Sequence, residues 1–176
     1  MTPTFKNVTY RGYTDSAPYP PIKVKAPNKE YADILMDDFA GPKGEFSAMS
    51  LYFYHHYTFG EDAGDYGAMA MHIAIAEMHH MEILAAVIRK LGGNPVFRGS
   101  KESNGRYWNA KNLDYSQSLC AGLQIALEGE TNAIAAYGKH AELIDDPFVK
   151  NILERIIGDE RLHRSYIHQM IETYCK

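Results

Sequence analysis

Residues 76–81 read Ala-Glu-Met-His-His-Met and lie in the middle of a long apolar segment, residues 68–91, with helical periodicity. Within this stretch Glu77 and His80 are three residues apart. On a helix, that spacing places the two side chains about 60° apart around the axis and one turn along it. A carboxylate and an imidazole on one face can bind the same metal ion. The stretch therefore predicts an interior helix that carries half of a metal site.

The same spacing occurs again near the C-terminus, where Glu160 and His163 lie in a second amphipathic segment. About thirty residues before each pair, another helical segment carries a further glutamate, Glu45 in the first half and Glu130 in the second. Four helices that each turn a glutamate inward, two of them adding a histidine at i+3, describe the dinuclear iron or manganese sites of four-helix bundles. The sequence thus predicts an all-α four-helix bundle with six metal ligands: Glu45, Glu77, His80, Glu130, Glu160 and His163.

Two tyrosines stand at matching positions after the upstream glutamates. Tyr52 follows Glu45 by seven residues, and Tyr137 follows Glu130 by the same interval. Two helical turns return a side chain to within about 20° of its starting direction. We therefore expect both tyrosines, together with His56, on the interior stripe, where they either pack as ordinary core residues or lie beside the metals. The matching positions indicate an internal duplication of one helix hairpin.

The remaining titratable side chains of these helices lie off the interior stripe. Glu128, for example, lies about 160° around the helix from Glu130, so we expect it at the surface. The other side chains of this kind are expected in solvent, at a subunit contact or in a structural role: His72, His79, Glu82, His140 and His168.

Composition and charge restrict the possible partners. A chain of 176 residues with 45% hydrophobic content can bury one good core, so we expect one domain. The net charge of −4 and the absence of a basic run argue against nucleic-acid binding and against attraction to an anionic membrane surface. Residues 1–20 lack a signal-peptide pattern, and no uninterrupted apolar stretch reaches membrane-spanning length. We therefore predict a cytoplasmic protein.

The two cysteines limit the routes for electrons. Cys120 and Cys175 do not form a C-x-x-C pair, so we expect neither a rubredoxin-type module nor a zinc knuckle. Any external electrons must then come from a separate protein or a small molecule.

The chain divides into an N-terminal arm, residues 1–28, and a bundle, residues 29–176. The arm holds five of the eight prolines and is expected to be extended. It is either a disordered tail or a segment packed across its own bundle or a neighbouring subunit. Packing is favoured because its apolar side chains are unfavourable in water: Phe5, Tyr10, Tyr13, Tyr19, Ile22 and Val24.

Five helices are expected in the second part. The first, residues 29–40, is a short leading helix that follows Asn28 as its N-cap. Residues 92–111 lack periodicity and fit the long crossover that ferritin-like bundles need between their second and third helices. Tyr107 and Trp108 are expected to hold this crossover in place. The four bundle helices are expected at residues 45–59, 68–91, 113–144 and 147–172.

These motifs resemble the ferritin-like di-metal superfamily. Residues 44–47 (Gly-Glu-Phe-Ser), residues 77–86 and the arm segment 19–25 look like manganese catalases and their spore-coat catalase-like relatives. Residues 130–137 (Glu-Thr-Asn-Ala-Ile-Ala-Ala-Tyr), with the later Glu160 to His163 pair, look more like rubrerythrin and bacterioferritin-type domains. The resemblance implies a homo-oligomer and, for the spore-coat branch, an association with spores.

The resemblance also implies a role for each ligand: Glu77 and Glu160 bridge two metals, Glu45 and Glu130 are terminal, and His80 and His163 each bind one ion. Some positions depart from both branches. Ala133 stands where rubrerythrins carry an extra glutamate, and Glu160 offers a full sixth ligand where manganese catalases keep the equivalent carboxylate off the metals. The chain also lacks the long C-terminal extension of manganese catalases.

Three functions follow from this reading. The first is a dinuclear-metal oxidoreductase that consumes hydrogen peroxide, by disproportionation as in manganese catalases. The second is a di-iron peroxidase or ferroxidase, related to rubrerythrin or ferritin, that uses peroxide or dioxygen and needs an external electron donor. The third is a structural coat-type protein whose metals stabilise the bundle. The expected cofactors are two manganese or two iron ions, because carboxylates and imidazoles suit both metals.

Overall fold

The computed structural model describes residues 13–176, and helices dominate it, as predicted. The helices are α1 (Lys29–Ala40), α2 (Glu45–Phe59), α3 (Gly64–Lys90), α4 (Leu119–Leu143) and α5 (Pro147–Tyr174), with a short 3-10 helix, η1 (Ala110–Asn112). Residues 13–176 contain no β-strand, only one isolated bridge between Arg98 and Tyr107.

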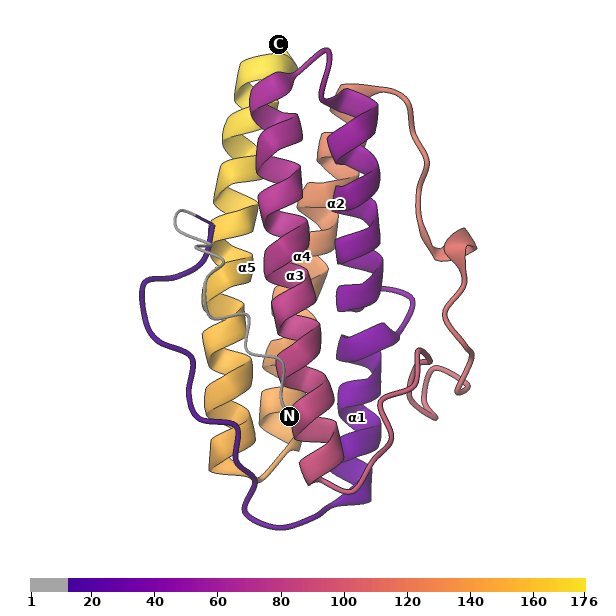
Figure 1. Ribbon diagram of the computed structural model, residues 1–176, viewed down its shortest axis with the longest axis vertical. Helices are drawn as coiled ribbons and strands as arrows, with labels where there is room; N and C mark the ends of the chain where they lie inside the picture. The colour runs from indigo at the N-terminus through magenta and orange to yellow at the C-terminus, as the bar shows by residue number, and fades with distance from the viewer. Residues whose placement is uncertain (1–12) are drawn as a thin grey trace, which may run out of the picture.

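The long helices form a four-helix bundle, which confirms the predicted fold class. Figure 1 shows α1 and α2 stacked end to end, so that together they cover the length that α3 covers alone. The main packing partners are α2 with α3 and α4 with α5, which makes two hairpins. Residues 91–118 run along the outside of the bundle and connect the first hairpin to the second (Figure 1).

The first residues of α1, α4 and α5 show which helix starts the sequence predicted correctly. Asn28 caps α1, with its side chain accepting hydrogen bonds from the N–H groups of Glu30 and Tyr31, and Pro147 lies in the first turn of α5, both as predicted. Ser118 caps α4, which begins six residues later than predicted because the preceding residues are extended.

Helix α3 begins at Gly64 rather than at residue 68. Gly67 at this corner looked like a loop residue, but it serves close packing between helices. A Cβ atom on Gly67 would lie 2.5 Å from the Cα atom of Gly60, so the end of α2 can approach the first turn of α3 only if Gly67 has no side chain.

The crossover is held in place by Trp108. Its indole Nε1–H donates to the Ser47 hydroxyl at 2.9 Å, and its ring lies 4.6 Å from that of Phe46. Tyr107, expected to help, is instead 75% exposed. One side chain therefore makes the contact that was predicted for two.

Cys120 and Cys175 form a disulfide, which the absence of a C-x-x-C pattern did not reveal. The bond joins the first turn of α4 to the residue after the end of α5. Disulfides are rare in the cytosol and common in oxidising compartments. The cytoplasmic location therefore stays a prediction that this bond does not support.

By length and composition alone, α3 could cross a membrane, so the prediction that no apolar segment is long enough was wrong by that criterion. However, 56% of its apolar window is buried inside the bundle. Glu77 and His80 on this helix are completely enclosed by protein. These are the properties of a core helix.

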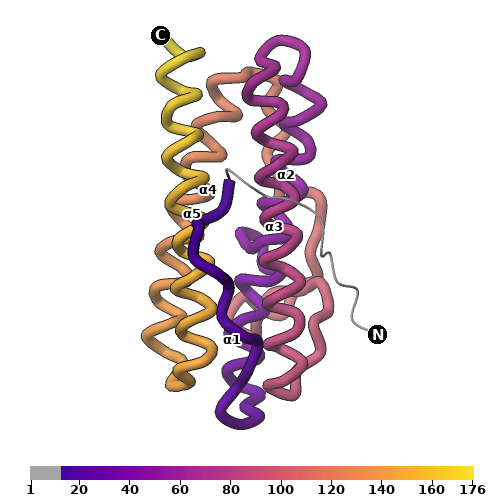
Figure 2. Tube along the Cα trace, turned by 60° about the vertical axis from the view of Figure 1, so that its left-hand side comes forward, coloured from indigo at the N-terminus to yellow at the C-terminus, as the bar shows by residue number. Residues whose placement is uncertain are grey.

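The described part of the arm packs on the bundle. Figure 2 shows the first described residues running alongside α3 and α5. The buried hydrophobic residues of the bundle form two clusters. Tyr19, Ile22 and Val24 pack against one of them, and Tyr13 packs against the other. Phe5 and Tyr10, also expected to pack, lie outside the described residues.

Candidate metal centre

The six side chains expected to bind metal converge at one level of the bundle. They form two overlapping groups in which the nitrogen and oxygen atoms all lie within 4.8 Å of one another. All six residues are buried. The first group is Glu45, Glu77, His80 and Glu160, and the second is Glu77, Glu130, Glu160 and His163.

Glu77 and Glu160 belong to both groups. The Nδ1 atom of His80 lies 2.8 Å from one carboxylate oxygen of Glu77, and the Nδ1 atom of His163 lies 3.1 Å from the other. Glu160 is placed in the same way, 3.2 Å from His80 and 3.7 Å from His163. Each of these two carboxylates thus faces both histidines, which is the arrangement that a bridging ligand needs.

The donor atoms fit a pair of metal ions. Buried polar groups normally have a hydrogen-bond partner. Four atoms of the cluster have none: Glu77 Oε1, Glu130 Oε2, Glu160 Oε1 and His163 Nδ1. Carboxylate oxygens and neutral imidazole nitrogens suit manganese and iron, and zinc sites usually have fewer ligands. Together with the relatives described below, this cluster supports a dinuclear metal site.

The electrostatics of the protein alone show how crowded the cluster is. Burial, and then the charge of neighbouring glutamates, raises the pKa of Glu45 and of Glu130 well above the usual range. Burial acts in the same direction on Glu77, but the imidazoles of His163 and His80 bring its pKa below the usual value. Without metal, the cluster therefore keeps some carboxyls neutral and others ionised.

The two histidines complete this balance. Burial alone would lower the pKa of His80, but the hydrogen bond with Asp159 and the neighbouring Glu160 carboxylate raise it well above the usual value. For His163, the charge of Glu77 has the same effect against burial. Protons on these imidazoles occupy the positions where divalent ions would supply positive charge.

The two tyrosines bond across the bundle, each to the other half of the centre. The Tyr52 hydroxyl of α2 donates to Glu130 of α4, and the Tyr137 hydroxyl of α4 donates to Glu45 of α2. Burial raises the pKa of both phenols well above the usual range, so both stay protonated. Each tyrosine can therefore orient a carboxylate through its hydroxyl hydrogen.

His56 does not line the centre, contrary to the expectation. Its Nδ1 atom is 2.8 Å from the carbonyl of Gly67, because α3 begins early and its first turn reaches this side chain. The fully buried residue is His55, whose Nδ1 atom lies 2.6 Å from the Tyr66 hydroxyl. Burial lowers the pKa of His55 to about 4.

Other side chains lie where the helical stripe places them. Glu128 and His72 are exposed, His79 is partly buried 3.3 Å from Glu82, and His168 is exposed beside Glu172. His140 is buried and pairs with Asp38 at 2.8 Å, a structural role as expected.

One polar residue close to the centre was missed. The Asp159 carboxylate, which is completely buried, accepts from Nε2 of His80 at 3.0 Å and from the Arg155 guanidinium at 2.6 Å. Burial alone would raise the pKa of Asp159, but its bonds with His80 and other donors lower it to about 2. Its position directly before Glu160 was visible, yet only the fold shows that it faces a histidine of another helix.

A cavity of about 690 Å³ leads to the centre between α2 and α4. Glu45, Glu130 and Glu160 lie in its lining, as do both tyrosines. Small residues of α2 and α4 form part of its walls: Ala48, Ala126, Gly129, Ala133 and Ala136. Because these side chains are short, the gap between the two hairpins stays open toward the carboxylates.

Comparison with known proteins gives the same fold. The sequence model of the family described as manganese containing catalase matches residues 17–102. The chain is 24% identical to YjqC of Bacillus subtilis (strain 168), over 83% of the chain and 63% of that protein. It is 23% identical to a probable manganese catalase of Clostridium acetobutylicum, over 85% of the chain and 74% of that protein. The chain thus spans less than two thirds of the first relative.

Solved structures agree at the level of fold. KatB, a manganese catalase from Anabaena PCC7120, superposes with a TM-score of 0.82 at 23% identity, covering 92% of this chain and 80% of that one. The bacterioferritin of Desulfovibrio desulfuricans superposes with a TM-score of 0.69 at 24% identity, covering 82% and 81%. The bundle agrees with both at the level of fold. The chain belongs to the ferritin-like superfamily of di-metal carboxylate proteins.

Proposed function

We propose that the protein converts two molecules of hydrogen peroxide into dioxygen and two molecules of water at a dinuclear manganese centre. The observation that carries this proposal is the pair of overlapping ligand groups that share Glu77 and Glu160. The match to manganese catalases over residues 17–102 supports the choice of reaction. Peroxide serves as both oxidant and reductant in this reaction, so no electron-transfer module is needed.

The proposed ligands give each metal a matched environment. Glu77 and Glu160 would bridge the ions, with Glu45 and His80 completing one site and Glu130 and His163 the other. Four carboxylates balance the charge of two divalent ions, which makes the loaded centre close to neutral. When bound, two redox-active ions can exchange two electrons with peroxide.

The protein supplies position and access. Tyr52 and Tyr137 hold the two terminal carboxylates through their hydroxyl hydrogens, and their raised pKa keeps these protons in place. The cavity between α2 and α4 would admit peroxide to the side of the centre where these carboxylates lie. Enclosure by the helices keeps the rest of the cluster dry.

A second candidate is a di-iron peroxidase or ferroxidase. Glu160 favours it, because this carboxylate lies in both ligand groups and offers the sixth ligand that manganese catalases leave off the metals. The likeness to bacterioferritin is in keeping with it. This reaction would take peroxide or dioxygen and an external electron donor.

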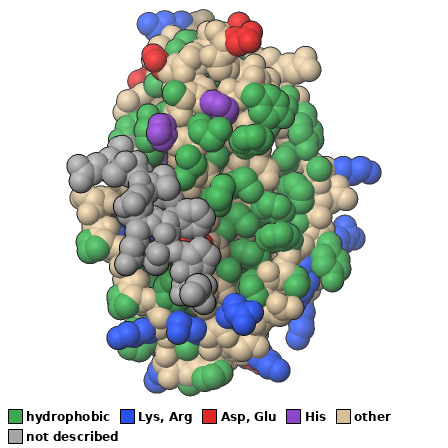
Figure 3. All heavy atoms as spheres, in the orientation of Figure 1, with side chains coloured by type: hydrophobic (Ala, Val, Ile, Leu, Met, Phe, Trp, Pro, Cys, Tyr) green, Lys and Arg blue, Asp and Glu red, His purple; other side chains and the backbone are tan. Residues whose placement is uncertain are grey.

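We also propose that the protein acts as a homo-oligomer, without nucleic-acid or membrane partners and in the cytoplasm or with spores. Hydrophobic side chains gather on the face formed by α2 and α3 (Figure 3). Phe53 and Tyr57 of α2 and Met78 of α3 are among the exposed large hydrophobic residues. Such a surface is suited to contact with another protein chain.

The test combines two measurements on protein purified without added metal. Elemental analysis gives the metals per chain, and an oxygen electrode follows peroxide on the same sample. About two manganese ions with oxygen release would support the proposal, and about two iron ions without it would favour the second candidate. Metal-dependent stability without turnover would favour the structural coat-type role instead.

A further inference from the structure

Both proposed histidine ligands turn their second ring nitrogen away from the centre, toward an acceptor that belongs to the N-terminal arm or is contacted by it. The Nδ1 atoms of His80 and His163 face the carboxylates, and their Nε2 atoms face outward. A histidine that donates its outer N–H to a fixed acceptor holds one tautomer and one ring orientation. The outer acceptors therefore matter for metal binding.

For His163 the acceptor belongs to the arm itself. Nε2 of His163 lies 2.8 Å from the backbone carbonyl oxygen of Tyr13. The Tyr13 ring is stacked on His72 of α3 with 5.2 Å between ring centres, and it also contacts Tyr166 of α5. These ring contacts fix the carbonyl where the imidazole needs it.

For His80 the acceptor is Asp159, and the arm holds that carboxylate. The Tyr19 hydroxyl donates to the same oxygen that accepts from His80, at 2.5 Å. The backbone N–H of Asp15 donates to the other oxygen at 2.6 Å. Two of the four hydrogen bonds to this carboxylate thus come from the arm.

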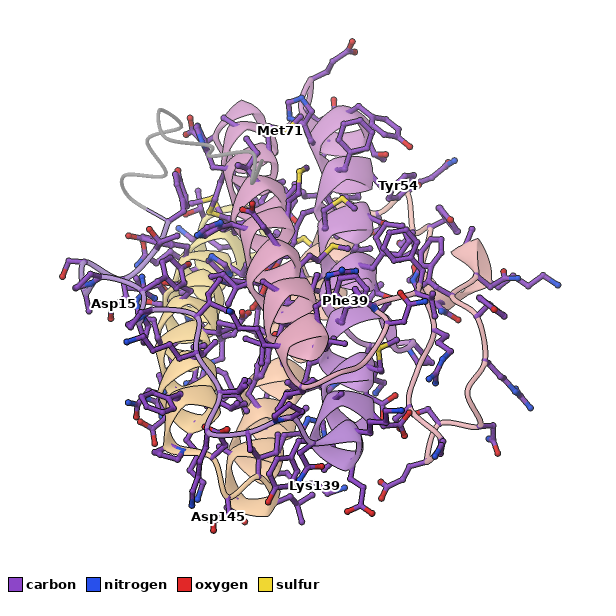
Figure 4. All side chains as sticks on the ribbon, turned by 60° about the horizontal axis from the view of Figure 1, so that its bottom comes forward. Asp15, Phe39, Tyr54, Met71, Lys139 and Asp145 are labelled. Carbon is purple, nitrogen blue, oxygen red and sulfur yellow. A yellow bond between two sulfur atoms is a disulfide. The ribbon has the colours of Figure 1, made fainter. Side chains whose placement is uncertain are left out.

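Arg155 of α5 clamps the arm in this position. Its Nε–H donates to the carbonyl of Ala17 at 2.7 Å, and a terminal N–H donates to that of Asp15 at 2.9 Å. The guanidinium carbon also lies 4.0 Å from the centre of the Tyr19 ring. Figure 4 shows Asp15 on the outer side of α5, with Tyr54 on the opposite side of the bundle.

Gly158 permits this close approach. A Cβ atom at this position would lie 3.3 Å from the Asp15 carboxylate, so a larger side chain would push the arm away from α5. The three atoms nearest to this Cβ all belong to the Asp15 side chain.

We propose that arm residues 13–19 complete the metal site from outside: the Tyr13 carbonyl and the Tyr19 hydroxyl are positioning groups for His163 and His80, so arm docking and metal binding stabilise each other. The inference rests on the dinuclear site proposed above. Neither group touches a metal, and each acts through a histidine or through Asp159. Because coupling is reciprocal, metal should hold the arm as strongly as the arm favours metal.

The first test removes one hydroxyl. Tyr19→Phe keeps the ring over Arg155 but loses the bond to Asp159. Tyr54→Phe is the matched control, because its hydroxyl donates to the Tyr115 carbonyl at 3.1 Å, away from the centre. Mn²⁺ titration, followed by the electron paramagnetic resonance signal of the free ion, should show about tenfold weaker binding for Tyr19→Phe alone.

A spectroscopic readout separates positioning from general stability. In Co²⁺-loaded protein, the outer N–H protons of the two histidine ligands should give shifted, exchangeable proton resonances. Tyr19→Phe should shift or broaden the resonance of His80 and leave that of His163. Equal Mn²⁺ affinity and unchanged resonances in this variant would overturn the role of Tyr19.

The second test displaces the arm. Gly158→Leu should lift it from α5, whereas Gly138→Leu, a helix glycine with no atom within 4 Å of the added Cβ, should not. Chymotrypsin should then cut after Tyr13 faster in Gly158→Leu, and Mn²⁺ should bind at least about tenfold more weakly. Mn²⁺ should also slow this cut in the unmodified protein.

The outcomes separate this inference from the proposed function. If the arm of Gly158→Leu is cut quickly while Mn²⁺ affinity is unchanged, the coupling is refuted and the metal site stands. If the unmodified protein binds no Mn²⁺ or Co²⁺, both the proposed centre and the coupling are refuted. Metal binding with the expected coupling but without peroxide turnover would support the arm's role and contradict the catalase reaction alone.

Discussion

Loading the centre with two divalent ions should release up to four protons at neutral pH. Without metal, burial raises the pKa of Glu45 and Glu130 well above the usual range, which favours the protonated form of both carboxyls. His80 and His163 also hold an extra proton each, because contacts with carboxylates outweigh burial and raise their pKa. Metal ligands must be deprotonated, so all four protons leave when the ions bind.

The charge of the cluster explains why this exchange is feasible. The metal-free cluster has two ionised carboxylates, Glu77 and Glu160, whose pKa values are lowered, and two imidazolium groups. It is therefore close to neutral. With two divalent ions and four carboxylates it is close to neutral again. Metal binding thus replaces protons without leaving a net charge in the core.

The size of the effect follows from the count. With two protons released per ion, the apparent affinity should rise about hundredfold per pH unit, or about 2.7 kcal/mol per ion. Lower pH should weaken metal binding, because protons compete with the metal ions for the same ligand atoms. The increase should continue with pH until the raised pKa values are passed.

Calorimetry can count these protons. Mn²⁺ is titrated into metal-free protein at pH 7 in buffers with different ionisation enthalpies, and the slope of heat against that enthalpy gives the protons released. Glu128→Gln is the control, because Glu128 is exposed and off the centre. Release of one proton or fewer for two ions, or an affinity that stays flat between pH 6 and pH 8, would refute the reasoning.

Four further outcomes are expected. Glu77→Ala or His163→Ala should abolish binding of the metal pair while circular dichroism still shows a helical fold, and retention of both metals would contradict the ligand assignment. Ala133→Phe should fill part of the cavity and lower kcat/KM for peroxide about tenfold at unchanged metal content, because access is narrowed. Cys175→Ser opens a disulfide between residues separated by 55 positions and should lower the free energy of unfolding by about 4 kcal/mol, measured by urea denaturation against the oxidised protein. The buried His55 imidazole, whose pKa is about 4, resists protonation in the folded state, so the free energy of unfolding should fall by about 3 kcal/mol between pH 6.5 and pH 4. His55→Gln should not show this part of the decrease, and unfolding curves at both pH values test it.

The main features of the centre could be read from the sequence because helical geometry links spacing to direction. Glu77 and His80 share a face by their spacing alone, and the upstream Glu45 and Glu130 fall on apolar stripes that must face the core. The structure brings these side chains together as expected. Their role as metal ligands stays a prediction.

What could not be predicted depends on contacts between segments far apart in the chain. Asp159 reaches His80 of another helix, and the arm carbonyl of Tyr13 reaches His163, with no periodic pattern to indicate either contact. The disulfide of Cys120 likewise depends on where two helix ends meet. His55 rather than His56 lies in the interior, because α3 begins earlier than expected and its first residues contact both side chains.

Trp108 has a practical consequence for anyone who studies this molecule in solution. It is the only tryptophan of the chain, its indole donates a hydrogen bond to Ser47 and its ring contacts that of Phe46 in a tilted arrangement, and these residues directly follow Glu45. Its fluorescence therefore arises from one known place, next to one end of the centre. Emission intensity should report in real time, without a label, when Mn²⁺ enters the bundle and when the crossover leaves it.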